Sequence, residues 1–273
     1  MEALEGKGYG PYPLRVCAEK VAEYVAATND DPDRWTSFAP PGWAAVVLFA
    51  VAPRLLTDPA LGDAGKSVIH GEQRFAWSGA IPIESELAVS GVVSKVRERG
   101  GVFFTTFEFQ ATGGDGALLE GSSTFLMSGT SPPAPASEPV DLPSPSTRGA
   151  NDLLPRSENG FPGMRRSASR SDLVRYAAAT RDWNPIHWDH DSAVTAGLPT
   201  IVVHGLLQAA WLLTAGCAVS RHDAPVAQAR FRFRSPMAAG SEGAVTGDTQ
   251  GTEVLATLAV GERVIVSANM TLR

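Results

Sequence analysis

The two halves of this 273-residue chain repeat one another, and no other feature of the sequence restricts its fold as strongly. Each half opens with a short amphipathic helix, predicted over 18–28 and 171–180, that ends in Ala-Ala-Thr and precedes a loop containing Asp. A long apolar helix comes next, over 43–56 in the first half and 203–219 in the second. Alternating residues then predict strands over 73–77, 87–96 and 102–110, and over 228–235, 243–247, 254–260 and 264–272.

An antiparallel sheet that alternates apolar and polar residues needs a cover for its apolar face, and one apolar helix in each half can provide it. The predicted unit is a curved antiparallel sheet wrapped around a central apolar helix. This is the hot dog fold, and two fused units form a double hot dog of the α+β class. Because the halves are duplicated, we expect them to pair as two subunits of a homodimer would. A homodimer of the whole chain is left open.

A Pro- and Ser-rich segment separates the two halves. Residues 131–152 include Ser131-Pro-Pro-Ala-Pro and Pro143-Ser-Pro-Ser. Proline removes amide donors and favours extended backbone, so this segment predicts a linker. We therefore predict an N-terminal hot dog domain over 1–130, a linker over 131–152 and a C-terminal hot dog domain over 153–273.

Composition excludes several other classes of protein. The net charge is −6, whereas binding to nucleic acid needs a basic face. The two cysteines, Cys17 and Cys217, indicate no disulfide framework. The apolar segments 43–56 and 201–219 contain Arg54 and His204, and neither is the uninterrupted run of about 20 residues that a membrane span needs. Residues 1–10 show no export signal, so we expect a cytoplasmic protein without nucleic-acid or membrane partners.

The segment after the second amphipathic helix carries the chemistry. Asn184-Pro185 stops the helix and forces a turn, so that Asp182 and His187 can face one small volume from either side of the bend. A carboxyl group and an imidazole together can take a proton from water and deliver one to carbon beside a carbonyl. Gly205, at the start of the apolar helix, leaves room for a substrate oxygen near unpaired amides, which predicts an oxyanion hole.

These residues resemble the hydratase 2 motif of the MaoC-like dehydratases, the (R)-specific enoyl-CoA hydratases. The residues that carry the resemblance are Asp182, Asn184, Pro185, Ile186 and His187, followed by Ala193 and by His204-Gly205. The family adds water to trans-2-enoyl thioesters, or removes it from (R)-3-hydroxyacyl thioesters, without a metal or an organic cofactor. The resemblance therefore implies a hydro-lyase whose substrate is an acyl thioester of coenzyme A or of an acyl carrier protein.

The resemblance also implies a role for each site residue. Asp182 and His187 form the catalytic dyad, Asn184 orients the loop or the substrate, and the Gly205 amide binds the thioester oxygen. His204 and Trp183 are further candidates for substrate contact. Arg181 stands where family members commonly have Gly. The loop 29–35 of the first half lacks a His, so one site per chain is expected and the first half is expected to house part of the acyl tunnel beside 40–45.

Alternatives stay open at several positions. A metal site at His187, Asp189, His190 and Asp191 is disfavoured, because His-x-x-His does not place both imidazoles on one helix face. His70 is interpreted as a structural polar residue. Arg230, Arg232 and Arg234 form either a solvated strand face or a contact for coenzyme A phosphates or an acidic carrier protein. The alternative functions are a dehydratase acting on carrier-protein-bound chains in fatty-acid or polyketide assembly, and a non-catalytic acyl-thioester-binding subunit.

Overall fold

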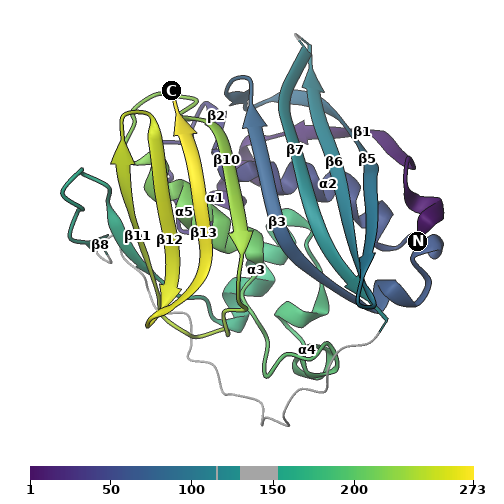
Figure 1. The fold of residues 1–273 in the computed structure, drawn as a ribbon. Coiled ribbons are helices and arrows are strands. Elements are labelled where there is room, and N and C mark those ends of the chain that lie inside the picture. The colour runs from purple at the N-terminus through teal and green to yellow at the C-terminus, as the bar shows by residue number, and fades with distance from the viewer. Residues whose placement is uncertain (115, 130–152) are drawn as a thin grey trace.

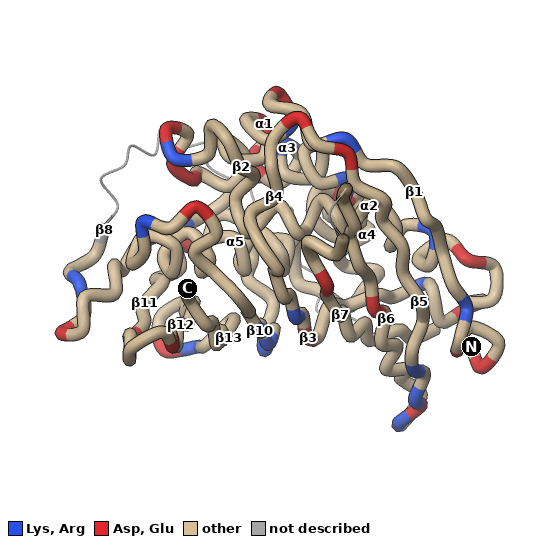
Figure 2. Tube along the Cα trace, turned by 90° about the horizontal axis from the view of Figure 1, so that it is seen from above, with Lys and Arg blue, Asp and Glu red and all other residues tan. Residues whose placement is uncertain are grey.

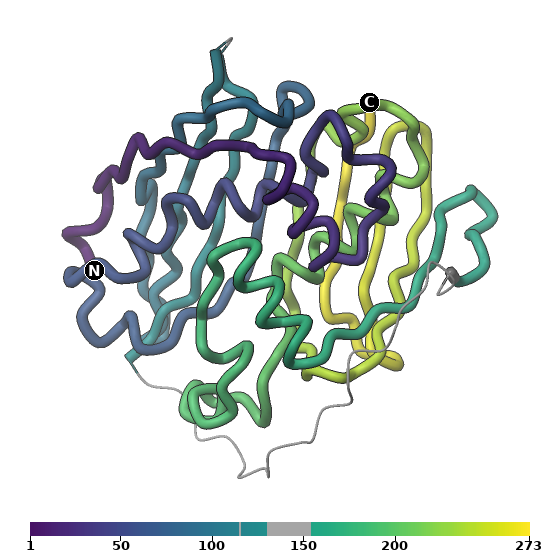
Figure 3. Tube along the Cα trace, turned by 180° about the vertical axis from the view of Figure 1, so that it is seen from behind, coloured from purple at the N-terminus to yellow at the C-terminus, as the bar shows by residue number. Residues whose placement is uncertain are grey.

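The computed structural model describes residues 1–114, 116–129 and 153–273, so the predicted linker 131–152 lies outside the described residues. All strand pairs in its main sheet are antiparallel, and helices cover one face of that sheet (Figures 1 and 3). The predicted α+β class is confirmed. Figure 2, viewed from above, shows the sheet strands on one side and helices α1 (Ala18–Thr28) and α3 (Arg170–Thr180) on the other.

The main sheet has 11 strands, and its two ends come from the two halves of the sequence. The strands, in spatial order, are β1 (Gly8–Val16), β5 (Ser85–Arg99), β6 (Val102–Gly113), β7 (Gly116–Ser128), β3 (Ser67–Trp77), β10 (Val226–Phe233), β13 (Arg263–Leu272), β12 (Glu253–Val260), β11 (Gly243–Gln250), β9 (Gly163–Arg166) and β8 (Leu153–Leu154). A separate pair is formed by β2 (Phe38–Ala39) and β4 (Ile81–Pro82).

The two predicted sheets are joined into one. Strand β3 pairs with β10, with Ala76 opposite Gln228 at one end of the register and Glu72 opposite Arg232 at the other. An unpaired strand edge leaves amides and carbonyls without partners, and this pairing satisfies one edge of each half. The pairing also brings the start of β3 beside the end of β10, where the two halves share a cavity.

Two apolar helices fill the space against the sheet, as the sequence predicts. Helix α2 (Ala44–Leu56) serves the first half and α5 (Gly205–Cys217) the second, and most residues of both are buried. In α5 the fully buried Trp211 side chain belongs to the hydrophobic core, whose burial is the main favourable contribution to folding. The remaining helices are α4 (His190–Thr195) and short 3-10 turns at Glu2–Leu4, Pro41–Trp43, Pro59–Lys66 and Pro185–His187.

The loop that lacks a His in the first half has a structural task. The Arg34 guanidinium donates hydrogen bonds to the carbonyls of Cys217 (2.7 Å) and Ser220 (2.8 Å), at the end of α5. A cation at the carboxyl end of a helix is favourable because the last carbonyls lack partners and carry the negative end of the dipole. The equivalent of the catalytic loop therefore ties the first half to the central helix of the second.

No single helix in the described ranges is long and apolar enough to cross a membrane. One bent pair, Pro41–Leu56 and Pro59–Lys66 with 102° between them, meets the criterion by length and composition alone.

Candidate active site

A tight turn after α3 places Asp182 and His187 as the sequence predicts. Helix α3 ends at Thr180, and Arg181 then adopts the left-handed conformation (φ 67°, ψ 19°). Glycine adopts this conformation at little cost, which accounts for the Gly common at this position in the resembling family. Asn184 then caps the turn Pro185–His187, since its side-chain oxygen accepts a hydrogen bond from the Ile186 amide (3.4 Å). Arg181 thus preserves the backbone path despite the change from Gly.

Three side chains meet at this turn. One oxygen of Asp182 and one ring nitrogen each of His187 and His204 all lie within 4.8 Å of one another. The Nδ1 atom of His187 lies 2.7 Å from the Val202 carbonyl, which can only accept a hydrogen bond. Nδ1 therefore carries the proton of the neutral ring, and Nε2 is left as a proton acceptor.

His204 lies behind the dyad, at the N-terminal cap of α5. Its Nε2 donates to the main-chain carbonyl of Asp182 (3.2 Å). Its ring stacks on His187 with centroids 3.7 Å apart and makes a tilted contact with Tyr176, with centroids 4.9 Å apart. The ring is fully buried, and Nδ1 has no hydrogen-bond partner among the described residues. His204 therefore contacts Asp182 and His187 and does not line the cavity, where substrate contact was expected of it.

Burial moves the pKa values of the dyad in opposite directions. It raises the pKa of Asp182 to about 7, against the opposing effect of the Asn184 amide. It lowers the pKa of His187 to about 4, against the hydrogen bond to Val202. Desolvation disfavours the charged form of both groups. Near neutral pH the His187 ring is therefore uncharged, and Asp182 can hold or release a proton.

The dyad opens into a cavity of about 300 Å³ between α5, β3, β7 and the end of β10. Four predicted site residues line it: Asp182, Asn184, His187 and Gly205. Its apolar wall comes from both halves, with Phe49, Leu56, Val68, Phe125 and Leu126 from the first and Leu198, Val203 and Leu206 from the second. The cavity thus combines the polar side chains of Asp182 and His187 with an apolar wall suited to a hydrocarbon chain.

Two expectations about the walls were wrong in detail. Trp183 does not line the cavity, and its side chain is 51% exposed because the turn directs it outward. Residues 40–45 do not line it either. Pro40 and Pro41 border a separate space of only about 10 Å³, because the start of α2 is packed tightly and its last turn, with Leu56, reaches the cavity instead.

Sequence reasoning missed two polar residues in the cavity wall. Gln208, one turn into α5, donates from Nε2 to the Val203 carbonyl (2.9 Å), and a lone amide in an apolar helix was the signal for it. His70 lies in the wall because a bulge between His70 and Glu72 shifts the register of β3 and redirects its side chains. Its ring lies between Phe125 and Phe233, with centroids 5.0 Å from each.

The donor set does not favour a metal ion. The rings of His187 and His204 are stacked with only 24° between their planes, so their lone pairs lie in nearly parallel planes and do not converge on one point. In the other candidate set, the Asp189 side chain accepts a hydrogen bond from the Ser192 amide (2.8 Å) and caps α4. Each set is better explained by the local hydrogen bonds.

The fold and the site define a double hot dog protein with a buried carboxyl–imidazole pair beside the first turn of a central helix. Residues 157–270 match the model of the MaoC like domain. This part of the chain therefore belongs to the family of MaoC like domains.

Relatives agree with this assignment. A protein named UPF0336 protein from Leifsonia xyli subsp. xyli is 30% identical over 141 residues, which are 46% of this chain and 95% of the relative. A mitochondrial 3-hydroxyacyl-[acyl-carrier-protein] dehydratase from Arabidopsis thaliana is 36% identical over 76 residues, 27% of this chain and 44% of its own. Peroxisomal multifunctional enzyme type 2 from Drosophila melanogaster is 25% identical over 248 residues, 85% of this chain and 40% of the relative.

Solved structures confirm the fold. A MaoC-like dehydratase covers 100% of this chain and 99% of its own at a TM-score of 0.79 and 22% identity. HtdX of Mycobacterium tuberculosis covers 97% and 99% at a TM-score of 0.75 and 20% identity. A further Mycobacterium tuberculosis protein, described as having a double hotdog fold, covers 98% and 96% at a TM-score of 0.59 and 11% identity.

Proposed function

We propose that this protein catalyses the reversible hydration of trans-2-enoyl thioesters of coenzyme A to (R)-3-hydroxyacyl thioesters, with Asp182 and His187 as its catalytic dyad and without a metal. One observation carries the proposal. A carboxyl oxygen of Asp182 and a ring nitrogen of His187 lie within 4.8 Å of each other, in a cavity that Gly205 and apolar side chains also line. Two polar atoms at such a separation can both hydrogen-bond one water molecule, since each bond is about 2.8 Å long.

The thioester carbonyl is oriented toward the start of α5. Amides of the first helical turn lack intrahelical partners and carry the positive end of the dipole, so they stabilise the enolate oxygen that develops during hydration. One such donor contributes about 10² to 10³ in rate. Gly205 and the Phe233 ring both line the cavity here, and the missing Cβ of Gly205 lets the ring pack close, because a Cβ would lie 3.2 Å from it.

Protons are then exchanged through the dyad. Nε2 of His187 takes a proton from the bridging water as oxygen bonds to C3, and protonated Asp182 delivers its proton to C2. The next turnover begins when His187 returns its proton to Asp182 through solvent or product release. Dehydration follows the same steps in reverse, so the thermodynamic direction depends on the supply of substrate.

The same chemistry supports one alternative substrate. The Arabidopsis thaliana relative is named as a dehydratase of acyl-carrier-protein substrates, and its 36% identity over 76 residues favours a carrier-protein thioester as the second candidate. Both candidates use the same dyad and differ in what carries the acyl chain outside the cavity.

The proposal is tested by mixing the purified protein with crotonyl-CoA and a longer trans-2-enoyl-CoA. Loss of the conjugated thioester absorbance, together with a product heavier by one water and of (R) configuration, is the expected result. Release of free coenzyme A without water addition would instead identify a thioesterase. Binding that stabilises the fold without turnover, with carrier-protein substrates also inert, would indicate a non-catalytic binding subunit.

The pH dependence of kcat/KM for hydration is expected to be bell-shaped. The active dyad holds one proton, on Asp182, while His187 is neutral. Because the pKa of Asp182 is about 7, the rate falls above that pH as the acid is lost. Because the pKa of His187 is about 4, the rate also falls below that pH as Nε2 becomes protonated. Initial rates in buffers of constant ionic strength check this profile, and a rate that still rises above about pH 8 would contradict Asp182 as the acid.

A further inference from the structure

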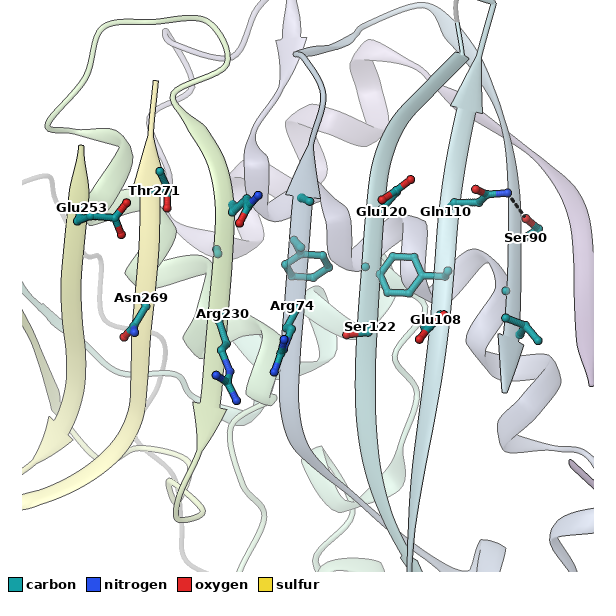
Figure 4. Close-up of a pocket in the computed structure, with 18 residues that line it drawn as sticks. Arg74, Ser90, Glu108, Gln110, Glu120, Ser122, Arg230, Glu253, Asn269 and Thr271 are labelled. Atoms are coloured by element: carbon teal, nitrogen blue, oxygen red, sulfur yellow. Dashed lines mark hydrogen bonds between the residues drawn. The ribbon is translucent and has the colours of Figure 1, made fainter. Parts of the chain in front are cut away.

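Arg230 and Arg232, on β10, lie on the face of the sheet that the helices do not cover. Phe231 and Phe233 alternate with them, and these rings face inward, to the core and to Gly205. Arg230 and Arg232 lie opposite Arg74 and Glu72 of β3, at the strand pair that joins the two halves. Figure 4 shows the Arg74 and Arg230 side chains next to each other on this outer face.

This cluster carries excess positive charge. The Glu72 carboxylate contacts Arg230 (2.7 Å), Arg74 (2.8 Å) and Arg232 (3.6 Å), so one negative charge faces three positive charges. Like charges directly opposite each other on paired strands are destabilising, and Arg74 and Arg230 are such a pair. Within the described part of the chain, the buried Nε of Arg230 has no hydrogen-bond partner. These features are typical of a site that is completed by an anion.

The cluster lies close along the chain to a residue of the active-site cavity. Strand β10 ends at Phe233, and Arg234, two residues after Arg232, lies just beyond the strand. Arg234 lines the active-site cavity, and its Nε donates to the Ser267 hydroxyl (3.2 Å). We name Arg74, Arg230, Arg232 and Arg234 the arginine track, since they run from the outer face to the cavity.

Two residues of the arginine track, Arg74 and Arg230, line a hollow large enough for a ligand. The outer groove measures about 780 Å³, and Ser122 and Asn269 flank Arg74 and Arg230 on its floor (Figure 4). The acidic side chains of the groove, Glu108, Glu120 and Glu253, come from β6, β7 and β12. Positive charge is therefore concentrated along β3 and β10, and the negative charges lie on either side of it.

We propose that the arginine track binds the phosphate groups of coenzyme A while the acyl thioester occupies the cavity. The inference rests on the proposed function and deepens it, because it selects coenzyme A as the acyl carrier. Guanidinium groups bind phosphate with two parallel hydrogen bonds, and coenzyme A carries a diphosphate and a 3′-phosphate. The arm of a carrier protein carries a single phosphodiester, which leaves most of the arginine track unoccupied.

The test compares two thioesters of the same enoyl group, one on coenzyme A and one on pantetheine, which has no phosphate. The measured quantity is the ratio of their kcat/KM values. In the double variant Arg230→Gln, Arg232→Gln, this ratio is expected to fall by about tenfold, mainly through the KM for the coenzyme A ester. Glu72→Gln removes the competing carboxylate and is expected to raise the ratio by a few fold. Arg97→Gln, on β5, is the matched control, because β6, β7 and β3 separate it from β10.

Calorimetric binding of free coenzyme A separates this inference from the proposed function. Binding that the double variant weakens, in a protein without turnover, would support the arginine track and overturn the hydratase proposal. Turnover with an unchanged substrate ratio in the double variant and in Glu72→Gln would overturn the arginine track and leave the hydratase. A loss of activity in the double variant that is confined to carrier-protein substrates would also overturn the arginine track. Thermal unfolding of each variant shows whether it is folded. The KM of the double variant is expected to depend less on salt concentration than that of the wild type.

Discussion

Asp182→Asn is expected to lower kcat for enoyl-CoA hydration by about 10² to 10⁴-fold, which is the usual contribution of general acid–base catalysis. Asn keeps the shape of the side chain but cannot deliver a proton to C2. His187→Gln is expected to cause a loss of the same order, since Nε2 then no longer accepts a proton from water. Because the two groups act together in one step, the double variant is expected to lose little more than either single variant. Steady-state rates with crotonyl-CoA provide the measurement.

The thermal stability of Asp182→Asn shows whether this variant is folded. Burial raises the pKa of Asp182 from 3.8 to about 7, so the folded protein binds a proton more tightly than the unfolded chain does. Stability therefore falls as pH rises between these two values, and above pH 7 the wild type carries the cost of a buried charge. Asp182→Asn removes that cost, so its melting temperature at pH 8 is expected to equal or exceed that of the wild type. Asp191→Asn, an exposed carboxylate on α4, is the matched control. An active Asp182→Asn would disprove the dyad.

The catalytic turn could be predicted because its determinants are local. Asp182, Asn184 and His187 lie within six residues, and a single Asn-Pro step fixes the bend between them. The apolar helices were predictable for a similar reason, because burial on all sides leaves an uninterrupted apolar run. In such segments the sequence pattern and the tertiary environment favour the same local structure.

The sequence pattern did not predict strands β7 and β1, whose residues are suited to their places in the sheet and not to a regular alternation. Strand β7 contains Gly121, where a Cβ would lie 2.3 Å from the Phe109 ring of the adjacent strand, so packing across strands requires a residue that weakens strand propensity. Strand β1 contains Pro11 and Pro13, which a strand tolerates at the edge of a sheet, where β1 lies. Neither strand shows the regular alternation that predicts one.

The sequence pattern also did not predict the parts of the site that depend on pairing between distant strands. Pairing between β3 and β10 places His70 in the cavity wall and Glu72 among the arginines, although these residues are more than 150 positions from their partners on β10. Arg230, Arg232 and Arg234 look equivalent in sequence. The structure distinguishes Arg234, in the cavity wall, from Arg230 and Arg232, on the outer face. The end of β10 at Phe233 makes this difference, because Arg234 leaves the sheet.

His204→Ala is expected to lower kcat by about 10²-fold with little change in KM, although His204 does not line the cavity. The His204 ring holds the Asp182 main chain through Nε2 and supports the His187 ring by stacking. Its loss leaves both catalytic groups present but no longer held in position, and a displacement of about 1 Å is enough for such a loss. Binding of the acyl chain depends on the apolar wall of the cavity and should change little.

A positioning role is distinguished from a purely structural one by rescue. His204→Gln is expected to recover part of the lost rate, because the Gln amide can reach the place of the ring Nε2 and donate to the Asp182 carbonyl, whereas His204→Phe keeps the stacked ring and loses that hydrogen bond. His222→Ala, at an exposed loop position, is the control. Assays below the melting temperature of each variant exclude unfolding as the cause. If kcat follows stability across the three variants, and Gln gives no recovery, His204 serves only the packing of α5. If Gln and Phe each recover a different share, the hydrogen bond and the stacking contribute separately to holding the dyad in place.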